Sequence, residues 1–562
     1  MVRQVFSIMH REVRGLHQAA YILAFFTFGS QLLALIRDRL LAHQFGAGIE
    51  LDLYYTAFRI PDILYVIFAS TLSVYVLIPF VSERIKKDSA ESARVLFSQI
   101  FSLFLIVYIS IGLLVCIFAG QIVTYLFPGF VSDVETLTLL VRILMFQPLL
   151  LGISSLYGVI TQMHYRFVLY AVGPLLYNMG IIGGLVFLYP YMGIAALAVG
   201  VVLGAMGHLC VQLPYVLRTS LSPRLVFSFD FAEIRKILNT SFARALTLSL
   251  HQLILLTLIG FASIMTVGSV SVFQFAFNLQ SVPLAIIGVS YSVAAFPLLA
   301  QLYAEKQMDV FGRYVSNTLK HILFWSLPVI VLFIVIRAQF VRVILGSGEF
   351  DWSDTRLTAA VLAVFIVSLT AQAVHLLMVR ALYAVGDTKT PFYVTLFSSL
   401  LTLILALYLY VLVTTNQVFS AHLDTFMRLD GVYGTEVLVL PLAYSCALLV
   451  HGFIMLLIAR KKLHISLRAL LKTCIQASIA SIGAGYVAYS VLKYTVMIFT
   501  ADTLMTVLIQ GILAGSAGVC VYFLLQYLLK SEELFEVFGM CKNKLTRKQE
   551  MVTPQDEDTL AV

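Results

Sequence analysis

Three charged residues, Arg37, Asp38 and Arg39, follow one another inside an apolar stretch near the beginning of the chain. If this stretch crosses a membrane, each ionisable side chain in hydrocarbon costs about 2.5–3.5 kcal/mol, so such residues usually face a bundle interior or a wet cavity. On a helix, Gln31, Arg37 and Asp38 fall near one face. Arg37 could present a permanent cation to an anionic ligand, since a guanidinium matches a phosphate in a bidentate fork. It could equally pair with Asp38 or Asp62 and hold helices together, and the residue types leave both interpretations open.

A second group of charges, Arg59 and Asp62, flanks Pro61 in the stretch FRIPDIL. Proline removes one backbone hydrogen bond, so this segment is either a bent helix that faces a cavity or the place of an internal ion pair. Arg244 and His251 lie seven residues apart and therefore on one helix face, where either could line a cavity. Three further basic residues in apolar segments are interpreted as structural anchors or side chains that extend to the membrane surface: Arg39, Arg142 and Arg380.

No constellation typical of catalysis appears in the sequence. It contains no HExxH, GxSxG or P-loop motif, which favours a protein that is not an enzyme and hydrolyses no ATP. Any uphill work would then depend on an ion gradient or the membrane potential. None of the six cysteines forms a CxxC or other metal spacing, so we expect no disulfide, no metal site and no cofactor.

Composition identifies the elements that must position these charges. The chain has 562 residues, of which 60% are hydrophobic and 12% charged, with a mean hydropathy of +0.95. Soluble proteins contain about 25% charged residues. The sequence therefore predicts an all-α polytopic membrane protein, with about fourteen apolar segments long enough to cross a ~30 Å hydrocarbon core.

The distribution of basic residues predicts the orientation of these helices. With a cytoplasmic N-terminus, 26 of the 37 lysines and arginines fall on the cytoplasmic side, 5 on the other side and 6 within spans. This asymmetry follows the positive-inside rule and predicts that both termini are cytoplasmic. It also accounts for the net charge of +8, so that no nucleic-acid partner is needed to explain it.

A weak internal repeat predicts the domain organisation. The stretch from Ala57 resembles the one from Ala276, and SLYGV at Ser155 resembles ALYAV at Ala381. Repeats six helices apart predict two pseudo-symmetric six-helix lobes with a cleft between them. The predicted parts are a cytoplasmic tail at 1–17, an N-lobe at 18–217, a cytoplasmic linker at 218–238, a C-lobe at 239–459, two C-terminal helices at 460–530, and a cytoplasmic tail at 531–562.

One segment carries a resemblance to a known family. RDRLLAHQFGAGIELDLYYTAFRIPDIL is similar to the MurJ/MviN family of lipid II flippases in the MOP exporter superfamily, and LYAVGDTKTP from Leu382 continues the pattern. The resemblance extends over about residues 20–530. It implies transport of an undecaprenyl-pyrophosphate-linked disaccharide-peptide across the bacterial cytoplasmic membrane for cell wall synthesis. It also implies alternating access between two lobes, a cationic cavity, a groove for the lipid tail by the last two helices, and resetting by membrane potential or a sodium ion.

The chain departs from the family pattern at several charged positions. Gln31 and Tyr65 stand where the family pattern has arginines, and Ser70 stands where it has a glutamate. Asn278 is the last residue of Ala-Phe-Asn, where the family pattern has Ala-Asp-Arg. We expect the missing charge to come from other helices, through Arg59, Arg244 or Arg380. The residues expected to line the substrate cavity are Arg37, Asp38, Gln31, Asp52, Arg59, Tyr65, Arg244 and Asn278.

Three other functions compete with lipid II transport. Amide and phenol groups at Gln31, Tyr65 and Asn278 also suit a flippase for another polyprenyl-linked oligosaccharide. A multidrug antiporter would favour acidic residues within spans, whereas the basic residues predominate here. A non-transporting membrane scaffold would have a collapsed or apolar space between the lobes.

Overall fold

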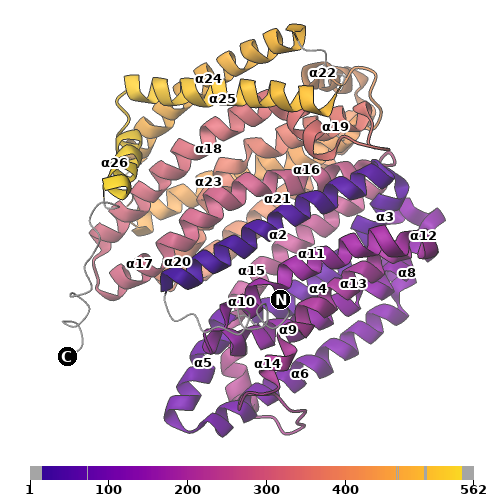
Figure 1. Cartoon of the computed structure of the whole chain (residues 1–562), viewed down its shortest axis with the longest axis vertical. Coiled ribbons are helices and arrows are strands. Elements are labelled where there is room, and N and C mark those ends of the chain that lie inside the picture. Colours follow the sequence, from indigo (N-terminus) through magenta and orange to yellow (C-terminus); the bar gives the residue numbers. More distant parts are fainter. Residues whose placement is uncertain (1–15, 72–73, 464, 466, 499–502, 547–562) are drawn as a thin grey trace. The chain divides into compact units, whose positions relative to one another are not determined.

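The computed structural model describes residues 16–71, 74–463, 465, 467–498 and 503–546, and within these ranges the chain is helical without a strand. Compact packing divides it into two units, and the division passes through helices α16, α18, α19 and α23. It does not follow the predicted lobe boundaries, so the arrangement of two six-helix lobes stays a prediction. Figure 1 shows the helices coloured along the chain.

Unit 1 comprises residues 1–282, 341–365 and 386–451. The helices that begin and end in its first part are α2 (Leu16–Phe45), α3 (Ile49–Ala57), α4 (Arg59–Thr71), α5 (Val74–Lys87), α6 (Ala90–Ile117), α7 (Ala119–Leu126), η1 (Pro128–Asp133), α8 (Val134–Leu144), α9 (Phe146–Met163), α10 (Phe167–Ala171), α11 (Gly173–Gly183), η2 (Gly184–Leu188), α12 (Tyr189–Met192), α13 (Ala195–Cys210), α14 (Leu213–Val216) and α15 (Phe231–Ser263). Its later part holds α21 (Lys389–Thr415), α22 (Gln417–Met427) and η4 (Thr435–Leu438).

Unit 2 comprises residues 283–340, 366–385 and 452–562. It holds η3 (Ala285–Val289), α17 (Ser290–Ala304), α20 (Leu369–Ala384), α24 (Leu467–Ile498), α25 (Leu504–Leu528) and α26 (Glu532–Thr546). The four helices shared with unit 1 are α16 (Ser269–Leu284), α18 (Met308–Leu345), α19 (Trp352–Val367) and α23 (Val439–Leu463).

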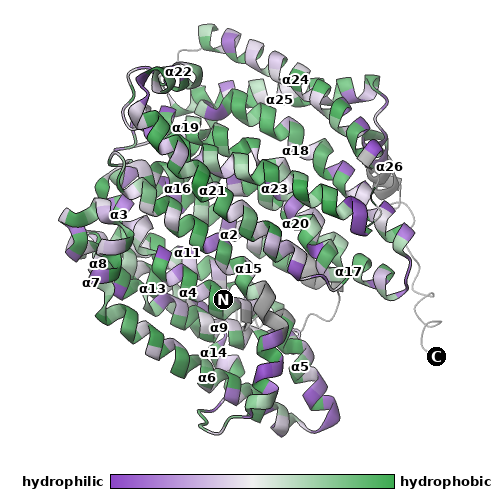
Figure 2. Cartoon of the chain, turned by 180° about the vertical axis from the view of Figure 1, so that it is seen from behind, coloured by the Kyte–Doolittle hydropathy of each residue, from purple (hydrophilic) through white to green (hydrophobic). Residues whose placement is uncertain are grey.

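Many of these helices are long and apolar enough to cross a membrane. Eleven pass this test among the described residues, and a bent pair, Trp352–Val367 with Leu369–Ala384, raises the number to twelve. The prediction of an all-α polytopic membrane protein is confirmed, whereas the count of fourteen stays a prediction. Large apolar side chains remain exposed on the helices, including Phe25 and Phe187, each 71% exposed. Figure 2 shows hydrophobic residues along most helices and hydrophilic ones gathered at α5, whose last turn contains Arg84, Lys86 and Lys87.

Glycines allow two helices of unit 1 to approach very closely. A Cβ added to Gly180 would lie 2.3 Å from the Cα of Gly204, and one added to Gly184 would lie 2.6 Å from the Cα of Gly200. Lipid tails provide little hydrophobic drive for helix association, so small residues that bring backbones together are a major source of stability. This contact fixes α11 and η2 against α13, and α11 also carries one residue of the site described below.

In unit 2, α26 packs against α18, α24 and α25. Leu534 is fully buried in a cluster with Phe324, Ala480 and Tyr522. The Tyr522 hydroxyl donates to the Phe324 carbonyl at 2.6 Å, which joins α25 to α18. The acidic first turn of α26 lies against Lys320 of α18 and Lys472 of α24, as described below.

Candidate functional site

Arg37 and Asp38 form an ion pair on α2. Arg37 Nε and Nη2 both donate to Asp38 Oδ1, at 2.9 and 2.7 Å. The Arg37 side chain is 19% exposed and that of Asp38 4%. The structure thus contains the local pair that was one of the two interpretations of these residues.

Asp38 also takes part in a series of side-chain hydrogen bonds that connects α2 to two other helices. Its Oδ2 accepts from Asn278 Nδ2 at 3.0 Å, and Asn278 Oδ1 accepts from Gln274 Nε2 at 2.7 Å. Gln274 Oε1 in turn accepts from Arg59 Nη2 on α4. Residues 274 and 278 are one turn apart on α16, which explains why both reach this series. Arg59 and Arg37, on separate helices, are thereby connected through two amides and one carboxylate.

Asn178 of α11 extends this series beyond Arg37. Arg37 Nη1 donates to Asn178 Oδ1 at 3.1 Å, while Asn178 Nδ2 donates to Ser30 Oγ at 3.2 Å and to the Pro174 carbonyl at 3.1 Å. We call the connected residues the polar chain: Arg59, Gln274, Asn278, Asp38, Arg37, Asn178 and Ser30. It joins α2, α4, α11 and α16 within unit 1.

Two buried polar atoms beside the polar chain have no hydrogen-bond partner among the described residues. They are Nε of Arg59 and the hydroxyl of Tyr55. The Tyr55 phenol lies within electrostatic range of Arg37, Asp38 and Arg59. Because a buried donor without a partner costs about 1–3 kcal/mol, these atoms mark a place where a polar ligand or water would be stabilised.

Reasoning from sequence missed Gln274, Asn178 and Tyr55 as site residues. Gln274 could have been found because it precedes Asn278 by one helical turn. Asn178 is a lone polar side chain in the apolar segment GPLLYNMGIIG, which is a recognisable signal. Tyr55 carries no such signal, since a tyrosine in an apolar segment is commonly a packing residue.

Asp52 lies apart from the polar chain and binds the beginning of α16. It is 2% exposed. Its carboxylate accepts hydrogen bonds from the backbone N–H groups of Gly268 and Ser271, both at 2.7 Å, and from Ser271 Oγ at 2.5 Å. A carboxylate at a helix N-terminus pairs with otherwise unsatisfied N–H groups and with the positive end of the helix dipole. The expected cavity residue is therefore, in this structure, a cap that ties α3 to α16.

Other contacts join the same end of unit 1. The Ala47 N–H donates to Asp354 Oδ2 at 3.1 Å, and the Glu349 N–H donates to the His43 carbonyl at 3.0 Å. Glycine is needed here, because a Cβ on Gly46, whose φ is +56°, would lie 2.7 Å from the Glu349 carbonyl oxygen. We call the region formed by loops 46–48, 264–268 and 346–351 the tied end.

Arg39 also contributes to this end of the molecule. Its Nη1 donates to the carbonyl of Val343 at 2.6 Å and to that of Ile344 at 3.3 Å. These are among the last carbonyls of α18, where a cation also interacts favourably with the helix dipole. Arg39 is thus an anchor between helices within unit 1.

Of the remaining predicted site residues, Gln31 and Tyr65 do not join the polar chain. Gln31 is exposed on α2. Tyr65 is half-buried on α4, next to Ser155 of α9. The side chain of Arg244, on α15, lies outside the described residues.

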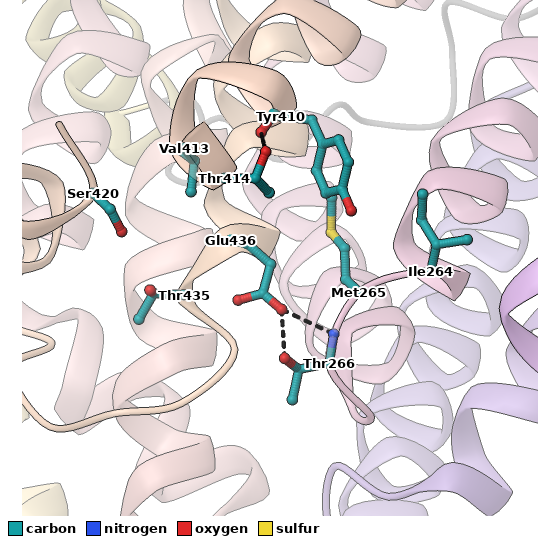
Figure 3. Close-up of a pocket in the computed structure, with 9 residues that line it drawn as sticks. All are labelled: Ile264, Met265, Thr266, Tyr410, Val413, Thr414, Ser420, Thr435 and Glu436. Atoms are coloured by element: carbon teal, nitrogen blue, oxygen red, sulfur yellow. Dashed lines mark hydrogen bonds between the residues drawn. The ribbon is translucent and has the colours of Figure 1, made fainter. Parts of the chain in front are cut away.

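A cavity of about 510 Å³ opens beside the tied end. Figure 3 shows its lining, in which Glu436 accepts hydrogen bonds from the backbone and the hydroxyl of Thr266. The other lining residues are Ile264, Met265, Tyr410, Val413, Thr414, Ser420 and Thr435. None of the predicted site residues whose side chains the structure describes lines this cavity.

Comparisons with known proteins give the family context of this geometry. A sequence model of the family described as lipid II flippase MurJ matches residues 41–509. The probable lipid II flippase MurJ of Rickettsia prowazekii (strain Madrid E) is 26% identical over 387 residues, which are 68% of this chain and 76% of the relative. That of Buchnera aphidicola subsp. Acyrthosiphon pisum (strain APS) is 28% identical over 380 residues, covering 67% and 74%.

Solved structures show the same fold. A lipid II flippase MurJ in an inward closed conformation superposes with a TM-score of 0.70 at 22% identity, covering 90% of this chain and 98% of that one. An inward-facing multidrug resistance MATE family transporter of the MOP superfamily gives a TM-score of 0.64 at 14% identity, covering 77% and 94%. At these identities the likeness concerns the fold alone.

Proposed function

Because this chain belongs to the lipid II flippase MurJ family, we propose that it moves the lipid-linked peptidoglycan precursor lipid II from the cytoplasmic to the outer leaflet of the bacterial inner membrane. The observation that carries this proposal is the family match over residues 41–509, most of the 562-residue chain. The chain is accordingly a transporter and an integral membrane protein. Its substrate is lipid-linked and reaches it from the bilayer.

The polar chain is the proposed binding site for the pyrophosphate and the first sugar. Arg37 and Arg59 supply the cations, and the unpartnered Nε of Arg59 supplies a donor that the protein itself leaves unused. Asn278 and Gln274 provide amides that suit sugar hydroxyls as well as phosphate oxygens. The polar chain thereby combines charge for the pyrophosphate with neutral groups for the saccharide.

Alternating access requires that the protein open at one end while the other is closed. The tied end is the proposed outer gate, since the positive-inside rule assigns the basic opposite ends of the helices to the cytoplasm. Asp52 and Asp354 close it through hydrogen bonds to backbone N–H groups. Opening would break these bonds, and the arrival or release of substrate would shift the balance between the two states.

The driving force and the place of the lipid tail complete the proposal. With no P-loop in the sequence, membrane potential or a sodium ion would reset the carrier. Helices α24 and α25 carry exposed apolar side chains, among them Ile482 at 67% and Ile512 at 59%, against which a polyprenyl chain could lie. Both termini are placed in the cytoplasm in this arrangement.

The decisive test is rescue of bacteria that are depleted of their own lipid II flippase. The full-length chain is expected to restore growth and the appearance of lipid II in the outer leaflet. Arg59→Gln is expected to abolish rescue, because it removes the cation and its unpartnered donor. Insertion is checked by the amount of protein in the membrane fraction.

A matched control is available on the surface. Lys87 and Glu83 form an exposed ion pair at 2.6 Å, and K87Q with E83Q should leave rescue intact. Failure of the properly inserted wild-type chain, with rescue of a different polyprenyl-linked oligosaccharide pathway, would transfer the assignment to that second substrate class.

A further inference from the structure

We propose that the cavity beside the tied end binds a primary ammonium group, and that Glu436 is its anionic partner. The proposal concerns a second site, separate from the polar chain, at the end of unit 1 that contains loop 264–268. The cavity is about 510 Å³, large enough for an amine-bearing side chain or a small diamine. Figure 3 shows Glu436 between the loop of Thr266 and the end of α21.

Among the described residues, the hydrogen bonds that Glu436 accepts come from neutral donors. Its Oε1 accepts from the N–H of Thr266 at 2.9 Å and from the hydroxyl of the same residue. None of the nine residues lining the cavity is a lysine, arginine or histidine. Within the lining of the cavity, the negative charge of this carboxylate therefore meets no basic side chain.

Two threonine hydroxyls of the cavity lining can accept hydrogen bonds from a ligand but have no proton left to donate to it. Thr414 donates its proton to the Tyr410 carbonyl at 2.9 Å, and Thr266 donates its proton to Glu436. With their protons committed, the oxygens of both threonines offer lone pairs. An ammonium group has three donors and no acceptor, so it can pair with the carboxylate and with hydroxyl oxygens of this lining. The ring of Tyr410 adds an aromatic surface that can attract a cation.

The segment that forms one wall of the cavity is also acidic. Residues 416–436 contain Asp424, Asp430 and Glu436 and one arginine, Arg428, a formal net charge of −2 with His422 neutral. The guanidinium of Arg356 donates to the Arg428 carbonyl, which holds this segment in place from α19. With Arg356 counted, the formal charge of this wall is −1, so the Glu436 carboxylate itself is what favours a cation over an anion here.

The position of the cavity connects it with the outer gate. Thr266, held by Glu436, lies in the same loop as Gly268, which donates to Asp52 at 2.7 Å. An ammonium group bound to Glu436 would act on the loop that the gate must release. The ammonium could belong to the peptide of the transported headgroup, which rests on the proposed function, or to a soluble amine.

The first experiment measures the preference for cations. In a full-length, cysteine-free background, Ser420→Cys is reacted with a trimethylammonium-ethyl and a sulfonato-ethyl methanethiosulfonate, each rate being normalised to that of a free thiol. We expect the cationic reagent to react about tenfold faster, and Glu436→Gln to reduce the ratio to within about twofold of one. Cadaverine should slow the cationic reaction, whereas 1,5-pentanediol should not.

Two variants provide controls. Tyr433 is 89% exposed and lies outside the cavity lining. For Tyr433→Cys, the ratio of cationic to anionic reaction rates should therefore be the same with and without Glu436→Gln. Thr266→Val removes the hydroxyl that binds Glu436 but keeps the charge, and should retain a cation preference of at least about fivefold. A normalised ratio near one at Ser420→Cys with Glu436 present, or no protection by cadaverine, would overturn the ammonium site.

A second experiment distinguishes the two sources of the ammonium. Flipping of lipid II with a free peptide amine is compared with flipping of its N-acetylated form, in the wild type and in Glu436→Gln. A defect confined to the free amine identifies the headgroup as the ligand, and unchanged flipping with loss of cadaverine protection identifies a soluble amine. If the wild type flips neither lipid but cadaverine protection persists, the proposed function fails and the ammonium site stands.

Discussion

Arg37 can bind an anion without leaving Asp38. A guanidinium has five N–H donors. Among the described residues, that of Arg37 donates two hydrogen bonds to Asp38 and one to Asn178. The remaining donors are available to a phosphate oxygen. The two interpretations of Arg37, a pair that holds helices and a ligand for substrate, are therefore compatible with each other.

A double substitution separates these two roles. Arg37→Ala leaves Asp38 as a buried charge without its partner, which costs about 3–5 kcal/mol in a fully buried pair and less here because Arg37 is 19% exposed. Arg37→Ala with Asp38→Asn removes both charges and should recover most of the lost thermal stability. Transport should remain at background, because the cation is still absent.

Thermal melting and lipid II flipping are measured on the same preparations of the single and double variants. Recovery of flipping together with stability in the double variant would show that Arg37 only holds helices together. Arg37→Lys is a useful comparison, since it keeps the charge but loses the fork of donors.

At the scale of elements, α26 is joined to unit 2 by charge and by packing. Glu532 accepts from Lys472 at 2.9 Å and lies 3.5 Å from Lys320, while Glu533 accepts from Thr473 at 2.6 Å. His321 contacts Glu536 at 2.9 Å. Hydrogen bonding to Lys472, followed by attraction to Lys320, lowers the pKa of the Glu532 carboxyl. Helix α26 lies outside the range 41–509 matched by the family.

This pKa shift predicts how the docking of α26 depends on pH. A carboxyl whose pKa is lower in the docked state contributes stability above its ordinary pKa of about 4.3 and loses it as the pH falls through the docked value. Docking should therefore be constant from pH 8 to 6 in a His321→Gln background and weaken below about pH 4. The anisotropy of a fluorophore on Cys541, with the other cysteines replaced, reports the motion of the helix.

Glu532→Gln is the matched variant for this measurement. It should lower the anisotropy at neutral pH and reduce the additional fall in acid. An unchanged acid response in Glu532→Gln would mean that another group, such as Glu533, controls the docking.

For the whole molecule, transport by alternating access requires the tied end to open and close in every cycle. Ala47→Cys and Asp354→Cys replace two residues joined by a 3.1 Å hydrogen bond. Linking them with a reducible bifunctional methanethiosulfonate should stop transport, and a reducing agent should restore it. The activity is measured as lipid II flipping in proteoliposomes.

Each single-cysteine variant, treated in the same way, controls for the reagent itself. The flipping activity of the untreated double variant shows how much transport is lost because the Asp354 carboxylate is missing. Continued transport by fully cross-linked protein would exclude passage of the substrate through this end.

The sequence alone predicted the features that depend on composition and on neighbours along the chain. Hydropathy predicted a polytopic helical membrane protein, because burial in lipid selects apolar residues at every turn of a span. The adjacency of Arg37 and Asp38 made their pairing foreseeable, and the order of motifs indicated the family. Helical spacing could also have added Gln274 to Asn278.

Which groups meet from distant parts of the chain depends on the tertiary structure. Asn278 reaches Asp38 across 240 positions of the chain, and Ser271 reaches Asp52 across 219. Such contacts depend on how helices pack and how their ends align, which local hydropathy does not encode. For this reason a residue expected in the cavity, Asp52, became the cap of α16, while Asn178 and Tyr55 joined the site unforeseen.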